Sequence, residues 1–175
     1  SLEREVSLVS GPACSAALRG KDFQVIELDA GLDVVQRLSE LRPDVVFNAL
    51  HGRWGEDGSI QGLLEWLRIP YTHSGVMASA LAMDKQRSKH IFSNAGLPTA
   101  PGFMIDKSGL LTSHPLDKPY VVKPINEGSS IGVYFVNPKE DPPLKVASDM
   151  PSILMVEEYI PGRELTVTVM GKKAL

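Results

Sequence analysis

The chain has 175 residues and a formal net charge of -3, from 18 Lys and Arg against 21 Asp and Glu. With 43% hydrophobic and 22% charged residues it has the composition of a globular protein, which excludes a disordered or fibrous chain. The mild acidity argues against non-specific binding to nucleic acid, and no apolar run approaches the ~20 residues that span a bilayer. The single cysteine, Cys14, excludes an internal disulfide framework and fits a reducing compartment.

The first half of the chain alternates helical and strand-like patterns. In chain order, these predict a helix over 7–19, a strand over 23–28, a helix over 34–41, a strand over 44–49 and a helix over 60–67. Ser7 is the predicted N-cap of the first helix, in which Pro12 predicts a late start or a kink. The alternation predicts an α/β unit with a parallel sheet.

Both ends of the chain indicate a piece of a longer protein. An α/β unit normally opens with a strand, whereas this chain opens with a charged segment and a helix. It stops at Leu175, shortly after a turn predicted at Gly171. We therefore expect a first strand before Ser1 and further structure after Leu175.

The pattern changes after about Ser74. Asp84 is a good N-cap for a helix that Gly96 can close. Strand-like runs separated by Pro- and Gly-containing connections then follow, at 102–106, 120–123, 132–136, 153–158 and 164–170. We expect an α+β half with an antiparallel sheet.

The segment from Lys123 to Gly132 carries the strongest local signal for chemistry. A lysine ends a strand, and a loop containing Gly128-Ser129-Ser130 leads toward the next strand. Small side chains let backbone N–H groups approach an anion, serine hydroxyls add donors, and the lysine supplies a charge for phosphate. The alternative is a hairpin loop with an incidental lysine. The pattern is not a P-loop, because no Gly-Lys-Ser/Thr follows the glycines.

Two further groups of charges have both a binding and a structural interpretation. Lys85, Arg87 and Lys89 stand near the start of a predicted helix, where cations oppose the helix dipole and need an anionic partner or full solvation. Glu157 and Glu158 end a predicted strand. Carboxylates there can accept hydrogen bonds from an adenine amine or ribose hydroxyls, or they can protect an exposed strand edge.

A glycine-rich, charged loop follows the predicted strand at 44–49. It contains His51, Glu56 and Asp57, and it lies at the carboxyl end of that strand, where open α/β sheets bind ligands. We expect it to contact a substrate. One histidine and two adjacent acids lack convincing metal-ligand spacing, so we assign no metal ligand.

Together these segments resemble the D-alanine–D-alanine ligases of the ATP-grasp family. The resemblance covers Glu3 to Leu175, and its motifs keep one order along the chain. The matching segments are Glu3-Arg4-Glu5-Val6-Ser7, His51-Gly52-Arg53, Gly55-Glu56-Asp57-Gly58, Pro70-Tyr71-Thr72, Ser74 to Ala80, Met83-Asp84-Lys85, Arg87-Ser88-Lys89, Gly96-Leu97-Pro98, Val122-Lys123-Pro124, Glu127-Gly128-Ser129-Ser130, Gly132 and Glu164-Leu165-Thr166-Val167.

The resemblance implies a domain organisation. Residues 1–73 would form an incomplete Rossmann-like, pre-ATP-grasp domain on the substrate side, without its first strand. Residues 74–160 would form the first, central ATP-grasp subdomain, and residues 161–175 the start of the C-terminal ATP-grasp subdomain.

The resemblance also implies a reaction. ATP would phosphorylate the carboxylate of one D-alanine, and the amine of a second would attack the acyl phosphate, giving D-alanyl-D-alanine for peptidoglycan precursor synthesis. Glu3 and Ser129 would be catalytic, with Glu3 holding the ammonium of the first D-alanine, and His51 would join them at the substrate. The implied ATP ligands are Lys85, Lys123, Glu127, Gly128, Ser129, Ser130, Glu157 (adenine amine), Glu158, Tyr159, Ile160 and Glu164 (ribose).

The implied cofactors are ATP and Mg²⁺ or Mn²⁺, with metal ligands expected after Leu175, so that the 175 residues alone would be inactive. A cytoplasmic homodimer that binds neither nucleic acid nor membrane is expected. One alternative is another ATP-grasp carboxylate–amine ligase, or one that takes D-lactate or D-serine as the second substrate. A second alternative is a non-catalytic nucleotide-binding module.

Overall fold

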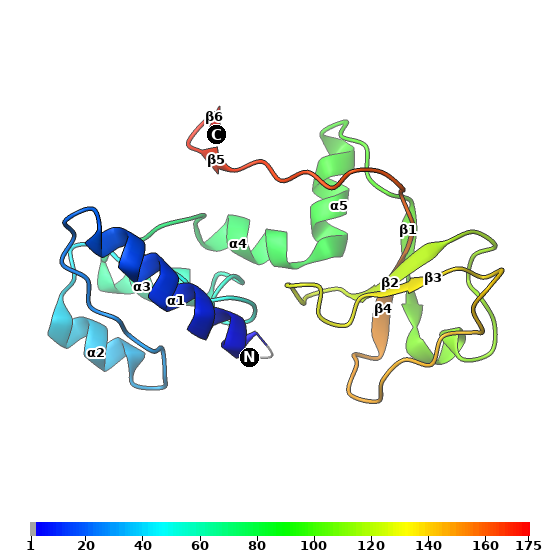
Figure 1. The fold of residues 1–175 in the computed structure, drawn as a ribbon, viewed down its shortest axis with the longest axis horizontal. Coiled ribbons are helices and arrows are strands. Elements are labelled where there is room, and N and C mark those ends of the chain that lie inside the picture. Colours follow the sequence, from blue (N-terminus) through cyan, green and yellow to red (C-terminus); the bar gives the residue numbers. More distant parts are fainter. Residues whose placement is uncertain (1–2) are drawn as a thin grey trace.

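The computed structural model describes residues 3–175 and shows a helical half and a half built around an antiparallel sheet. In Figure 1, α1, α2 and α3 lie on one side and β1 to β4 on the other, with α4 and α5 between them. The predicted helices at 34–41 and 60–67, and the helix that begins after Asp84, are confirmed. The helices are α1 (Arg4–Arg19), α2 (Val34–Leu41), α3 (Ser59–Leu67), α4 (Val76–Met83) and α5 (Lys85–Asn94).

The first helix, α1, begins earlier than predicted. It starts at Arg4, so Ser7 lies inside the helix and is not its N-cap. The Ser7 hydroxyl donates to the carbonyl oxygen of Glu3 at 3.3 Å, which is how a serine inside a helix commonly satisfies its hydroxyl. Pro12 lies within α1 without ending it, although a proline there removes one backbone hydrogen bond.

The helical half lacks the predicted parallel sheet. Residues 23–28 and 44–49 form no strands, and the parallel pairing within the described residues of this half is a single bridge between Val46 and Tyr71. A strand requires a hydrogen-bonded neighbour, and no described segment forms a ladder with residues 23–28. The two predicted strands are therefore wrong. A small core of Leu38, Ile60 and Leu64 packs α2 against α3 instead.

The other half contains a four-stranded antiparallel sheet in the order β1-β4-β2-β3, which confirms the α+β prediction. A short 3-10 helix at Lys107–Leu110 was not predicted. Six side chains that are at most 2% exposed form the core: Leu110, Tyr120, Val122, Val136, Leu154 and Val156. The strands are β1 (Gly102–Asp106), β2 (Tyr120–Pro124), β3 (Tyr134–Val136) and β4 (Ile153–Glu158).

Most of the predicted last strand of the chain does not form. The predicted strand at 164–170 is wrong over 164–168, where exposed side chains such as Leu165 and Val167 have no sheet to pack on. Only β5 (Val169–Met170) pairs, with β6 (Lys173–Ala174), across a turn at Gly171. None of the helices in the described part of the chain is both long and apolar enough to cross a membrane.

Replacing Leu154 by alanine tests the core of the sheet. Leu154 is fully buried in the central strand β4, so Leu154→Ala should lower the free energy of unfolding by about 2–5 kcal/mol in urea titrations. The matched control is Ile153→Ala, because the neighbouring Ile153 side chain is 42% exposed and should cost much less. Equal losses for the two variants would contradict this core.

Candidate functional site

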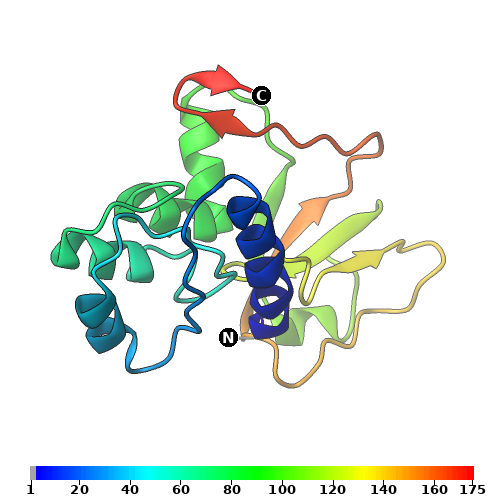
Figure 2. The ribbon, with the colours of Figure 1, turned by 60° about the vertical axis from the view of Figure 1, so that its left-hand side comes forward.

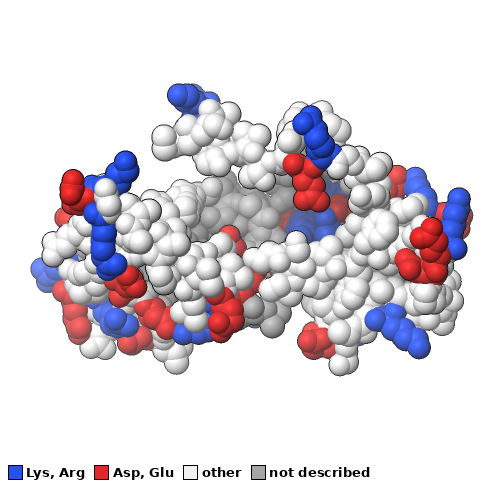
Figure 3. Space-filling model, in the orientation of Figure 1, with Lys and Arg blue, Asp and Glu red and all other residues white. Residues whose placement is uncertain are grey.

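A cavity of about 500 Å³ lies where the helical half meets the sheet half. In Figure 3 this face of the molecule is hollowed between the two halves, with Lys or Arg atoms inside the hollow. The size is that of a small-molecule site. The lining residues come from the α4–α5 junction, β2, the loop after β2 and the glycine-rich loop: Glu56, Ala82, Met83, Lys85, Val121, Lys123, Pro124, Glu127, Gly128, Ser129, Ser130, Ile131 and Val133.

A second cavity of about 260 Å³ shares Ala82, Lys85 and Lys123 with the first. Its other lining residues are Ser88, Lys89, Phe92 and Glu157. The Lys85 and Lys123 side chains therefore lie between the two cavities, and each can face a ligand that extends through both.

Glu157 is a buried carboxylate held between two lysines. It is 8% exposed, and it forms ion pairs with Lys89 through Oε1 and with Lys123 through Oε2. Burial alone would raise the pKa of Glu157, but hydrogen bonds from Lys123 and Lys89 outweigh burial and lower it. The carboxylate is therefore ionised at neutral pH.

Lys85 occupies a less favourable place for a cation. It is the first residue of α5, and its ammonium group donates to the backbone oxygens of Glu127 and, at 3.4 Å, of Ile125. Burial, and then repulsion from Lys123, lower the pKa of Lys85. An anion beside both lysines would reduce this repulsion and stabilise both charges.

The loop after β2, here called the serine loop after Ser129 and Ser130, bends back onto the start of α1 (Figures 1 and 2). Ser129 and Ser130 adopt left-handed backbone angles, with φ of 47° and 58°. The Gly128 amide donates to Glu3 Oε1 at 3.2 Å, and Ser129 Oγ donates to Glu3 Oε2, so the two residues predicted to be catalytic are in direct contact. The same loop lines the first cavity, so it joins the Glu3 carboxylate to the lysines.

The Glu3 carboxylate is also enclosed by the glycine-rich loop. It is 1% exposed, and a Cβ atom on Gly52 would lie 2.4 Å from its Oε1. Gly52 has a φ of +67°, in the left-handed region that favours glycine. Both the backbone angle and the close approach therefore require glycine at this position.

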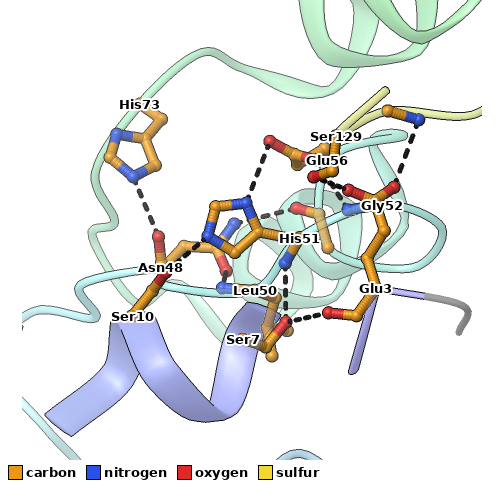
Figure 4. A network of polar contacts seen from close by, with 12 residues as sticks. Glu3, Ser7, Ser10, Asn48, Leu50, His51, Gly52, Glu56, His73 and Ser129 are labelled. Carbon is orange, nitrogen blue, oxygen red and sulfur yellow. Dashed lines mark hydrogen bonds and ion pairs between the residues drawn. The ribbon is translucent and has the colours of Figure 1, made fainter. Parts of the chain in front are cut away.

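His51 lies between α1 and Glu56 (Figure 4). Its Nε2 shares a hydrogen bond with Ser10 Oγ at 2.9 Å, and its backbone N–H donates to Ser7 Oγ at 2.9 Å. His51 Nδ1 is 4.0 Å from Glu56 Oε1, while Glu56 Oε2 accepts the Gly52 amide at 2.6 Å. The structure thus brings His51 close to Glu3 and Ser129, the other two predicted substrate residues.

Glu3, His51 and Glu56 have ligand atoms within 4.8 Å of one another, the one such group among the described residues. Mg²⁺ prefers an octahedron of oxygens, whereas this group includes an imidazole. The group therefore does not fit the expected magnesium ion.

Four predicted ATP ligands stand apart from the two cavities. Glu158 follows Glu157 in β4, points to the opposite face of the sheet and pairs with Lys118 at 2.5 Å. Tyr159 packs edge-on against Phe135, with ring centroids 4.8 Å apart. Ile160 and Glu164 are exposed in the segment after β4. None of the four lines either cavity, and their roles stay predictions.

Two residues of this site were noted in the sequence but were not assigned to the site. Lys89 binds Glu157, and the signal for it was present, because a cation near a helix N-terminus calls for an anionic partner. Glu56 lines the first cavity beside the serine loop. No local pattern separates it from Asp57, whose carboxylate instead accepts the backbone amides of Trp54 and Ser59.

Comparison with known proteins gives one consistent family. The sequence profile described as "D-ala D-ala ligase N-terminus" matches residues 29–74, and that described as "D-ala D-ala ligase C-terminus" matches residues 91–175. The chain is 63% identical to a D-alanine–D-alanine ligase of Ruegeria pomeroyi and 61% identical to one of Dinoroseobacter shibae, each over all of this chain and 57% of the relative. The chain thus spans a little over half the length of these curated relatives.

Solved structures agree with the sequence matches. The crystal structure of a D-alanine–D-alanine ligase from Bacillus anthracis aligns with a TM-score of 0.68 and 30% identity, over 93% of this chain and 55% of that one. The same enzyme complexed with ATP aligns with a TM-score of 0.69 and 31% identity, over 93% of this chain and 56% of that one.

The ion pairs of Glu157 with Lys89 and Lys123 should make the free energy of unfolding depend on pH. The pKa of Glu157 is lowered from 4.5, so its contribution is complete above about pH 4.5 and is lost as the pH falls through the lower, folded-state value. Urea unfolding of the wild type and of Glu157→Gln should therefore differ most near neutral pH and converge in acid. A difference that stays constant down to about pH 3 would contradict the ionised pair.

Proposed function

Because the chain belongs to the D-alanine–D-alanine ligase family, we propose that the protein joins two D-alanines into D-alanyl-D-alanine with ATP as the energy source. One observation carries the proposal beyond the family. The buried Glu3 carboxylate is hydrogen-bonded to the serine loop, and that loop lines the cavity that contains Lys85 and Lys123. An acceptor for an ammonium group thus lies next to cations suited to phosphate.

We propose that ATP lies across both cavities. The adenine would enter the second cavity, where its amine donates to Glu157, and the phosphates would reach Lys85, Lys123 and the amides of the loop at 127–130. Lys85 and Lys123 line both cavities, so the phosphates would meet two cations in the first cavity, while Lys89 and Glu157 line only the second. Glu158, Tyr159, Ile160 and Glu164 would complete the nucleotide site.

The reaction follows from this placement. The first D-alanine would bind with its ammonium group on Glu3 and its carboxylate toward the lysines. A carboxylate oxygen attacks the γ-phosphorus, ADP leaves, and an acyl phosphate forms. The amine of the second D-alanine then attacks the acyl carbon and loses a proton, and inorganic phosphate leaves. Lys85, Lys123 and the loop amides stabilise the charge on the transferred phosphoryl group.

We further propose the domain organisation of an incomplete Rossmann-like unit over 1–73 and ATP-grasp subdomains over 74–160 and 161–175, in a cytoplasmic homodimer. The division of the structure into a helical half and an antiparallel sheet half supports the boundary between the first two units, and the homodimer and its location are carried over from the family. A divalent cation such as Mg²⁺ or Mn²⁺ would shield the phosphates when bound. The described residues offer no fitting site for it, so no step is assigned to it.

Lys123→Met should weaken ATP binding. Loss of a charged hydrogen-bond donor to phosphate costs about tenfold or more in affinity, measured by titration calorimetry. Lys139→Met is the matched control, because Lys139 is exposed and lines neither cavity. Unchanged binding by Lys123→Met would remove Lys123 from the phosphate site.

Glu3→Gln should impair the use of D-alanine and leave ATP binding intact. Glutamine keeps an acceptor for Ser129 but removes the charge that would pair with the ammonium group, so the KM for D-alanine should rise about 30-fold or more. The assay measures formation of D-alanyl-D-alanine from ATP and D-alanine by the full-length natural protein. If the wild type forms no dipeptide from ATP and D-alanine, the proposed activity is wrong.

A further inference from the structure

We propose that Lys89 is a positioning residue for Glu157, holding this carboxylate toward the base of the nucleotide while Lys123 serves the phosphates. The inference rests on the proposed function, since it takes Glu157 as the acceptor of the adenine amine. It assigns a role to a side chain that reaches neither the phosphates nor D-alanine in that scheme.

The Glu157 carboxylate is confined on the side of β1. Gly102 lies opposite Glu157 in the β1–β4 ladder, and a Cβ atom on Gly102 would lie 2.7 Å from Glu157 Cγ. The glutamate side chain therefore fills the space that a side chain at residue 102 would take. It can present its oxygens only away from β1, toward the lysines and the second cavity.

Lys89 is fixed by two partners from different parts of the chain. It projects from α5, and its ammonium group donates both to Glu157 Oε1 and to the carbonyl oxygen of Ala100, just before β1. The side chain is 19% exposed. Lys89 lines the second cavity and not the first, so a ligand on the phosphate side does not compete for it.

The single ammonium group of Lys123 would have to serve both Glu157 and a phosphate group. It pairs with Glu157 Oε2, and it lines both cavities. A phosphate group in the first cavity would share or take this ammonium group. Lys89 then supplies the charge that keeps Glu157 ionised and oriented. A carboxylate has about four lone-pair positions, so Glu157 can bind Lys89 and still accept an amine.

An ionised and oriented Glu157 should make the site prefer adenine over hypoxanthine. The 6-amino group of adenine donates to a carboxylate, whereas the 6-oxo group of hypoxanthine is an acceptor and is repelled by it. Loss of Lys89 should therefore weaken binding of ATP much more than binding of ITP. A purely structural role would weaken both nucleotides alike.

The experiment measures the Kd of ATP and of ITP by calorimetry for the wild type, Lys89→Met, Lys89→Gln and Lys89→Arg. We expect the ATP Kd to rise about tenfold in Lys89→Met and Lys89→Gln, with the ITP Kd nearly unchanged. Lys89→Arg should restore most of the ATP preference, because a guanidinium can donate to both Glu157 and Ala100. Lys107→Met is the control: its ammonium also binds backbone carbonyls, those of Ser148 and Met150, away from both cavities.

The outcomes separate the inference from the proposed function. Equal weakening of ATP and ITP in the folded variants, or no weakening, overturns the role of Lys89 and leaves ATP binding standing. A wild type that binds ATP and ITP equally also overturns it, because Glu157 then does not distinguish adenine from hypoxanthine. A wild type that binds neither nucleotide overturns the ATP site itself, and the inference with it. If Lys89→Met unfolds at a much lower temperature than the wild type, Lys89→Gln provides the same comparison in a polar variant.

Discussion

The arrangement of the site depends on the hydrogen bonds that the Glu3 carboxylate accepts from Gly128 and Ser129. These partners are separated by 125 residues of sequence, and the contact fixes the serine loop against the start of α1. It works only because Gly52 leaves room for the carboxylate. A buried carboxylate needs such donors to offset its lost hydration. The Glu3 carboxylate, the serine loop and the cavity lined by Lys85 and Lys123 are therefore positioned together.

In the second cavity, one carboxylate and several backbone oxygens balance the charges of three lysines. Lys89 and Lys123 share the single carboxylate of Glu157, while Lys85 relies on backbone oxygens. Removing one partner of a buried ion pair leaves an uncompensated charge, so the glutamate and lysines depend on one another. Their sources, α5, β2 and β4, meet here because β4 lies between β1 and β2 in the sheet.

The sequence was most informative where a local rule decides the structure. Asp84 accepts the Arg87 amide as an N-cap, and β1 and β4 have the predicted bounds, since apolar runs between turn residues mark them. It failed for residues 23–28, whose strand-like pattern finds no ladder partner among residues 3–175. The pairing of Lys89 with Glu157 joins residues 68 positions apart, which no local pattern reports, although the misplaced cations of α5 indicated that an anion was needed.

The lowered pKa of Lys85 links this electrostatic arrangement to ligand binding. Its first cause is burial and its second is the charge of Lys123, so bringing an anion between these two lysines favours the charged form of both. A phosphate chain would thus bind more tightly than it would to the same lysines on an open surface, where water screens them. Glu157 neutralises part of the charge of Lys89 and Lys123, whereas Lys85, held by backbone oxygens, keeps its charge available to an anion beside the serine loop.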